Sequence, residues 1–235
     1  YLREADALGQ FAALVSSDDR FAVPQVVDEL TKKEVLTMTY MKGQPIETVF
    51  HSSGTERNRI ARNILELNLN EVFIWGVVQT DPNFANYRYE NDTGVIQLLD
   101  FGATRFYNQD QIKLYQMLMK AAIEGENSDI IVFAEKIGYL LGNEPDSYKN
   151  NLIDLLLMVS EPFRARDSYD FGRSDLAVRM QQSFFQMRLN NNYGTLPPVD
   201  VLFLHRKLAG LYLLLSQLQA KLPIRNNNLV NEIIH

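Results

Sequence analysis

The sequence has no cysteine, which excludes a disulfide framework and thiolate metal sites. It has only three histidines, His51, His205 and His235, and no two of them have the spacing of a metal-binding pair. It also lacks a run of about 18 uncharged apolar residues, the length that a membrane-spanning helix needs. The net charge of −6 argues against nucleic acid as the main partner, because phosphate backbones bind cationic surfaces.

The 235 residues are enough to bury a substantial core, as one large domain or two small ones, and 46% of them are hydrophobic. The first residue is tyrosine rather than methionine, and a helical pattern begins at once with Leu2 and Ala5. We therefore expect the chain to be a fragment of a longer protein.

The most informative stretch runs from Gln79 to Gly102. Asp81 is followed five residues later by Asn86, and an apolar run then leads into Asp100-Phe101-Gly102. This combination is typical of the kinase fold, where one carboxylate orients the nucleophile and two oxygen ligands hold Mg²⁺ against the phosphates. The sequence predicts that Asp81 orients the acceptor and that Asn86 and Asp100 bind Mg²⁺.

A second Asp-Phe-Gly tripeptide occurs at residues 170–172. It follows a polar stretch, with no strand-like run before it and no Asp-x4-Asn pattern upstream. We predict that this copy is a loop without a role in metal binding.

The residues before this stretch predict a helix to about residue 16, two strands at 23–30 and 35–40, and a central helix at 55–74. Further helices are predicted at about 109–124, 128–141, 148–160, 173–190 and 198–221, with a short one from Asn228. The fold class is therefore α+β, a mostly helical kinase-like lobe with part of the smaller lobe.

The second predicted strand, at 35–40, would lead into the hinge between the lobes. Met38 would then be the gatekeeper, with the Thr39 carbonyl and the Met41 amide on the adenine.

Protein Ser/Thr/Tyr kinase activity is disfavoured by the residues around these motifs. A new helix is expected by Gln109, which leaves no room for an activation segment, and no Ala-Pro-Glu tripeptide closes one. Gln79-Thr80 also stands where protein kinases have His-Arg.

The predicted helix at 198–221 has two interpretations. Its leucines repeat at steps of three and four, which favours a helix buried on most sides over a groove for a lipid tail or a partner helix. We interpret His205-Arg206-Lys207 on this helix as a polar break in a packed surface; the alternative is a contribution to the ATP site.

The chain resembles the C-terminal lobe of the UbiB family, the aarF-domain atypical kinases of coenzyme Q biosynthesis, in the branch whose catalytic loop reads Gln-Thr-Asp-Pro-Asn. The resemblance runs nearly from end to end. It rests on the stretches 1–5, 24–36, 99–105, 161–163 and 204–207.

The resemblance implies a division into a remnant of the small lobe at 1–41 and a helical lobe at 42–235, which contains the catalytic loop 79–86. Glu4 would be the helix-C glutamate that pairs with the lysine holding the nucleotide phosphates, and that lysine would lie upstream of Tyr1. The implied cofactors are ATP and Mg²⁺. The implied partners are coenzyme Q biosynthesis enzymes and a lipid or quinone precursor, with peripheral attachment to the bacterial inner membrane or the mitochondrial matrix face.

Three functions remain open at this stage. The leading hypothesis is a Mg-ATP-dependent atypical kinase or ATPase that supports coenzyme Q biosynthesis. The second is a nucleotide-gated scaffold or lipid-binding pseudokinase for a quinone biosynthetic complex. The third is an antibiotic or choline-type small-molecule kinase, which would use Asp81 and Asp100 in the same roles. Those proteins, however, usually have histidine before the catalytic aspartate.

Overall fold

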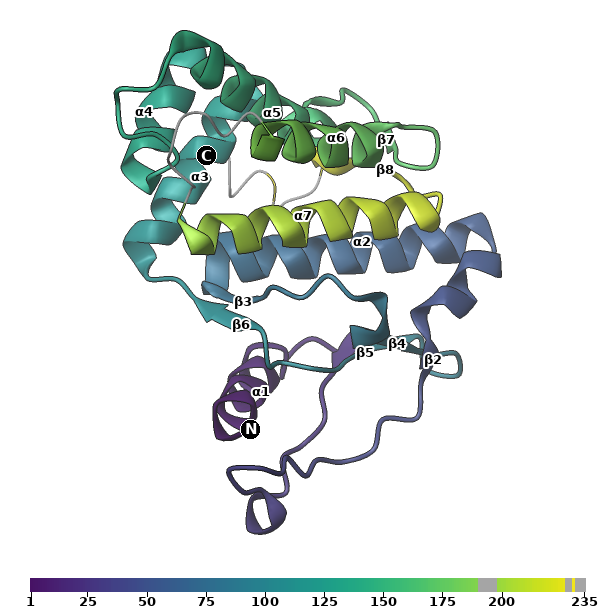
Figure 1. Cartoon of the computed structure of the whole chain (residues 1–235). Coiled ribbons are helices and arrows are strands. Elements are labelled where there is room, and N and C mark those ends of the chain that lie inside the picture. Colours follow the sequence, from purple (N-terminus) through teal and green to yellow (C-terminus); the bar gives the residue numbers. More distant parts are fainter. Residues whose placement is uncertain (190–197, 227–229, 231–235) are drawn as a thin grey trace.

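The structure is a computed structural model, and it describes residues 1–189, 198–226 and 230. The short helix predicted from Asn228 begins outside these residues. Seven α-helices are present in the described part: α1 (Leu2–Leu14), α2 (Gly54–Asn70), α3 (Gln109–Glu124), α4 (Asn127–Ile137), α5 (Asp146–Arg164), α6 (Leu176–Leu189) and α7 (Val199–Gln217). In Figure 1, α7 runs along α2, with α3 to α6 on one side of this pair and α1 on the other.

Helix α2 lies at the centre of the fold. The Ser53 side chain caps it by accepting a hydrogen bond from the Glu56 amide, and most of its apolar residues are buried. One π-helical turn (η3, Glu71–Trp75) continues it to Gly76, which has a φ of 66°. A Cβ at Gly76 would lie 2.4 Å from the Tyr107 carbonyl oxygen, so only glycine fits this sharp exit from the helix.

The strands that follow α2 frame the candidate site. Strand β3 (Val77–Gln79) pairs antiparallel with β6 (Thr104–Phe106). A four-stranded sheet has the order β1 (Phe21–Ala22), β5 (Val95–Leu98), β4 (Tyr87–Glu90) and β2 (Gln44–Pro45), with β1 parallel to β5 and the other pairs antiparallel. This sheet contains strands from both sides of residue 41, where the sequence predicts the lobe boundary; that boundary remains a prediction.

Buried apolar residues form two clusters. The larger one joins α1, α2 and the strands to α7, and the smaller one lies between α3, α4 and α5. Five short 3₁₀ or π turns connect these elements within the described residues: η1 (Asp28–Leu30), η2 (Ile46–His51), η3, η4 (Phe84–Asn86) and η5 (Ile224–Asn226).

The two strands predicted at 23–30 and 35–40 are wrong as continuous elements. The runs meet only at the isolated bridges Val26↔Met38 and Lys32↔Val35, and residues 28–30 form the turn η1. Pro24 has no amide hydrogen to donate, and a two-stranded ladder is marginal without further strands beside it. Hydrogen bonds from Val27 to Thr37 and from Thr39 to Gln25 nevertheless keep the two runs antiparallel.

Two further predictions need correction. The second Asp-Phe-Gly begins in a short strand, β7 (Tyr169–Asp170), paired with β8 (Lys221–Leu222), rather than lying wholly in a loop. Its Phe171 is buried against Tyr212. The helix predicted at 198–221 ends at Gln217, because the chain turns at Gln219, where φ is 49°, before entering β8.

Candidate functional site

The open end of the β4–β5 hairpin brings Asn86 and Asp100 together. In this hairpin Tyr87 is opposite Leu98, so the next pair outward is Asn86 and Leu99. The Leu99 amide donates a hydrogen bond of 2.8 Å to the Asn86 carbonyl oxygen, and Asp100 is the next residue. The predicted metal ligands, separated by 14 positions in the sequence, therefore lie on adjacent strand ends.

The catalytic loop fixes Asp81 against Asn86. The Asn86 side-chain nitrogen donates to Asp81 Oδ2 at 3.1 Å, which leaves Asn86 Oδ1 available as a ligand. The Asn83 side chain accepts from the Ala85 amide and caps the turn η4 between these two residues. The loop thus holds a carboxylate and an amide oxygen side by side.

Asp100 has an unusual backbone conformation for an aspartate, with φ at 56°. Its Oδ1 accepts a hydrogen bond of 3.1 Å from the Gly102 amide. Its carbonyl oxygen accepts one of 3.1 Å from the Gln79 side chain. Non-glycine residues in this region cost about 1 kcal/mol or more and are typical of sites where a side chain is aimed.

Gln79 and Thr80 connect the catalytic loop to the Asp-Phe-Gly turn. Gln79 Nε2 binds the Asp100 carbonyl, as described above. Thr80 Oγ1 donates to the Ala103 carbonyl oxygen at 2.7 Å, and the Thr80 amide donates to the same oxygen at 3.3 Å. The pair that replaces His-Arg therefore has a structural role: it ties β3 to the turn carrying Asp100.

Helix α1 places Glu4 beside the same turn. A Cβ built on Gly102 would be 3.4 Å from Glu4 Oε2 and 3.3 Å from Asp100 Oδ1. Burial, and after it the negative charge of Asp100, raises the pKa of Glu4 above its ordinary value. The backbone amide of Phe101 acts to lower the pKa of Glu4, but less strongly than the groups that raise it. Packing of the Phe101 ring on Phe11, with centroids 4.7 Å apart, completes the contact with α1.

Helix α7 supplies two cations to the catalytic loop. Arg206 Nη2 donates to Asp81 Oδ1 at 2.8 Å. Lys207 Nζ contacts Glu71 Oε2 at 2.7 Å and the Gln79 carbonyl at 2.8 Å. Glu71 Oε2 also accepts from the Gln79 amide at 2.8 Å, so this buried ion pair holds both main-chain groups of Gln79.

The interpretation of His205-Arg206-Lys207 as only a polar break in a packed helix is therefore wrong for two of its three residues. His205 fits it: the Tyr139 hydroxyl lies 2.6 Å from its Nε2, and burial lowers the pKa of His205 to about 4. Gly210, one turn after Arg206, was a signal that could have identified the contact. Glycine in a helix interior often marks a close approach of another chain segment.

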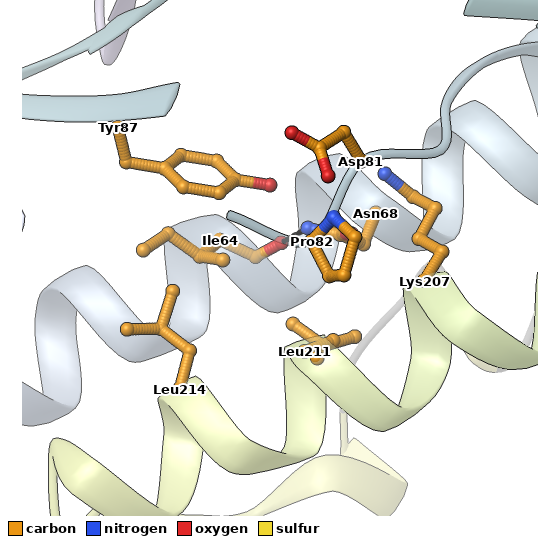
Figure 2. Close-up of a pocket in the computed structure, with 9 residues that line it drawn as sticks. Ile64, Asn68, Asp81, Pro82, Tyr87, Lys207, Leu211 and Leu214 are labelled. Atoms are coloured by element: carbon orange, nitrogen blue, oxygen red, sulfur yellow. Dashed lines mark hydrogen bonds between the residues drawn. The ribbon is translucent and has the colours of Figure 1, made fainter. Parts of the chain in front are cut away.

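At Gly210 the backbone of α7 touches the catalytic loop. A Cβ there would lie 2.0 Å from Pro82 Cβ. Next to this contact is a cavity of about 10 Å³, roughly the space of one water molecule, lined by residues of α2, the loop and α7. Figure 2 shows the Tyr87 ring pointing toward the Asp81 carboxylate above the α7 side chains Lys207 and Leu211. The cavity is far too small for a nucleotide.

The predicted hinge residues lie apart from these groups. Met38 is 39% exposed. The Thr39 amide and hydroxyl are engaged with the Gln25 main chain at 2.9 Å. Within the described residues, no hydrogen bond or ion pair connects Met38, Thr39 or Met41 to the catalytic loop. Their role in adenine binding remains a prediction.

The donor set suits magnesium. Asn86 Oδ1 and the Asp100 carboxylate are hard oxygen ligands, and Mg²⁺ in phosphotransfer sites is usually held by one or two such groups with water and phosphate oxygens. Over the described part of the chain, three or more His, Cys, Asp or Glu residues nowhere gather as a metal site. No helix in those ranges is long and apolar enough to cross a membrane.

Comparison with known proteins gives consistent results. Residues 1–133 match the model of the ABC1 atypical kinase-like domain. The chain is 37% identical to the atypical kinase COQ8, mitochondrial, of Saccharomyces cerevisiae, over 94% of the chain and 44% of that protein. It is 34% identical to coq-8 of Caenorhabditis elegans, over 94% of the chain and 29% of that protein.

A similar match is to COQ8B of Danio rerio, with 34% identity over 96% of the chain and 36% of that protein. The chain thus spans less than half the length of these relatives. A solved structure of Rv3197 with erythromycin from Mycobacterium tuberculosis superposes with a TM-score of 0.70 and 21% identity, over 100% of this chain and 57% of that one. The predicted kinase-like α+β fold and the predicted family are confirmed.

Proposed function

This chain belongs to the ABC1 atypical kinase-like family, and from its site we propose that it forms the catalytic lobe of a Mg-ATP-dependent atypical kinase or ATPase. The single observation that carries the proposal is the arrangement of Asp81, Asn86 and Asp100. The first two share a hydrogen bond of 3.1 Å, and the last two lie on adjacent strand ends. Asp81 can therefore orient the acceptor while Asn86 and Asp100 serve as the pair of metal ligands, the division of roles that phosphoryl transfer requires.

Each residue has a role that its contacts support. Asp81 orients the acceptor hydroxyl or water through its carboxylate. Asn86 Oδ1 and the Asp100 carboxylate hold Mg²⁺, which supplies charge neutralisation of the phosphates when bound. Glu4 approaches from α1 and orders the lysine that the family places upstream of this chain.

The biological role that we propose is support of coenzyme Q biosynthesis. The basis is the similarity to relatives named COQ8, at 34–37% identity over nearly the whole chain. The protein would act at the periphery of a membrane, the mitochondrial matrix face or the bacterial inner membrane, beside enzymes that modify a quinone precursor.

The test is a thermal-shift titration of the full-length protein with Mg-ATP and Mg-ADP. A nucleotide that binds only the folded state raises the melting temperature. We expect a magnesium-dependent rise in the wild type and its loss in Asp100→Asn. Asp170→Asn is the matched control, because it makes the same change in the second Asp-Phe-Gly, where the Asp170 carboxylate accepts from the Arg173 amide and pairs with the exposed Arg173 side chain. Equal shifts in the wild type and Asp100→Asn would contradict the metal assignment.

A second function, a nucleotide-gated scaffold or lipid-binding pseudokinase, is favoured by one observation. Val199, Leu202 and Leu213 on α7 are 58%, 40% and 45% exposed, whereas eight of the 19 residues of that helix are buried. Complementation of a coenzyme Q-deficient strain separates the two functions. A hydrolysis-dead Asp100→Asn protein that still complements supports the scaffold, and one that does not supports the enzyme.

A further inference from the structure

The catalytic loop has no cation of its own. Between Gln79 and Asn86 the only charged side chain is Asp81. Glu4 and Asp100, which flank Gly102 in the Asp-Phe-Gly turn, are also carboxylates, and the nearby cation Arg3 donates to the Thr104 carbonyl oxygen at 3.3 Å. A nucleotide with its terminal phosphate beside Asp81 would therefore meet negative charge from the loop. Phosphotransfer sites counter this charge with a cationic side chain in addition to the metal.

Arg206 is the cation that reaches this position. Its Nη2 donates to Asp81 Oδ1 at 2.8 Å, whereas Asn86 occupies the other carboxylate oxygen. The Arg206 side chain is 59% exposed, and Asp81 is 25% exposed. The neighbouring Lys207 is 3% exposed and is engaged with Glu71 and Gln79, so it is not accessible to a ligand.

The guanidinium of Arg206 has donors to spare. Arginine carries five N–H groups in a planar fork, and in the described contacts only Nη2 is used. A planar fork can hold a carboxylate on one side and a phosphate on another, which an ammonium group does less well. An exposed ion pair of this kind adds little to stability by itself. Its place on the catalytic aspartate is therefore better explained by function.

The base of this side chain is fixed in two ways. Lys207, the next residue, is tied to the main chain of Gln79 at 2.8 Å. Gly210, one helical turn later, has no space for a Cβ against Pro82, the residue after Asp81. Helix α7 thus packs directly on the catalytic loop, and these two contacts fix the backbone from which the exposed Arg206 side chain extends.

We propose that Arg206 supplies, from α7, the cation that contacts the terminal phosphate of the bound nucleotide while it orients Asp81. This inference rests on the proposed function, because it requires a nucleotide at this site. It predicts discrimination between ATP and ADP: the contact exists only when the third phosphate is present.

The experiment compares dissociation constants of Mg-ATP and Mg-ADP for the full-length wild type, Arg206→Ala and Arg206→Lys. In Arg206→Ala we expect affinity for Mg-ATP to fall by about tenfold or more relative to Mg-ADP, the size typical for loss of one charged hydrogen bond. Arg206→Lys should recover part of the ATP preference, because it keeps the charge without the fork. Arg173→Ala is the control, since that side chain is 91% exposed and pairs with Asp170, away from the Asp81 loop.

The outcomes separate the two proposals. An unchanged ratio of ATP to ADP affinity in Arg206→Ala overturns the phosphate contact, even if turnover falls, because a residue that only orients Asp81 would affect both nucleotides alike. If the wild type still shows the magnesium-dependent shift, the proposed function stands without Arg206. A wild type that binds neither nucleotide overturns both. Should the alanine variant be unstable, Arg206→Gln, which keeps the side-chain length, is measured in its place.

Discussion

Lys207 and Glu71 form an ion pair with a distance of 2.7 Å in which the two side chains are only 3% and 2% exposed. They come from α7 and from the π turn after α2, and both contact the main chain of Gln79. Because β3 ends at Gln79 and leads to Asp81 two residues later, the pair sets the starting point of the catalytic loop. A buried pair of charges is thus used to position a loop, not to fill a core.

Breaking this pair should destabilise the protein strongly. Lys207→Met or Glu71→Gln alone leaves a buried charge without its partner, and we expect each to lower the free energy of unfolding by about 3–5 kcal/mol. The double variant should lose much less than the sum, because no charge is then left unpaired. Chemical denaturation of the four proteins in a double-mutant cycle measures this coupling. Additive losses would show that the two charges act independently.

Gly210→Ala should weaken the seating of α7 on the catalytic loop. The added methyl would lie 2.0 Å from Pro82 Cβ, so the helix or the loop must move. Overpacking of this kind typically costs about 1–3 kcal/mol, and the displacement should also reduce nucleotide turnover.

Gly9→Ala is the matched control for that substitution. It makes the same change inside α1, where a Cβ would meet nothing within 4 Å. Alanine is the better helix former, so stability should rise by about 0.5–1 kcal/mol. Equal effects of the two substitutions on unfolding and turnover would refute a special contact at Gly210.

The sequence predicted that Asp81, Asn86 and Asp100 lie together, but it did not predict the residues that support them. Asp81, Asn86 and Asp100 lie within 20 positions and form a known local motif, Asp-x4-Asn followed by Asp-Phe-Gly. Their proximity could therefore be predicted from the sequence. Arg206 contacts Asp81 across 125 positions, and that contact depends on how α7 packs on α2, which no local pattern encodes. The composition of α7 did not indicate the contact either. A polar triplet in a leucine-rich helix is typical of a break in packing, and only the fold shows which groups the triplet contacts.

The prediction of two strands in the first 41 residues was wrong for a different reason. The runs at 23–30 and 35–40 have the apolar character of strands, but strand formation depends on neighbours that supply hydrogen bonds. Here they meet only at isolated bridges. The prediction of α2 was correct because the hydrogen bonds of a helix are internal to it and the apolar residues of α2 cover most of its circumference.

His205 should make stability depend on pH. Burial lowers the pKa of its imidazole from 6.5 to about 4, and the Tyr139 hydroxyl faces its Nε2. Below pH 6.5 the unfolded chain therefore binds a proton that the folded chain does not, so stability falls as the pH drops from 6.5 toward 4. The slope is at most about 1.4 kcal/mol per pH unit, roughly 3 kcal/mol in total.

Denaturant unfolding at a series of pH values between 7 and 4 tests this dependence. Carboxylates titrate in the same range, so the informative quantity is the difference between variants. His205→Gln removes the titrating group and should flatten the profile, whereas the exposed His51→Gln should leave it unchanged. Parallel profiles for the wild type and His205→Gln would contradict the assignment.

Residues 1–235 alone should bind Mg-ATP weakly or not at all. Glu4 lies near Asp100, and burial together with the negative charge of Asp100 raises the pKa of Glu4. Within the described residues it forms no salt bridge, and in the proposed function its partner is a lysine outside residues 1–235. Calorimetric titration of this chain should show no micromolar binding, whereas the full-length protein should bind and Glu4→Gln should weaken it. A micromolar dissociation constant for residues 1–235 would mean that the phosphates are held by groups within this chain.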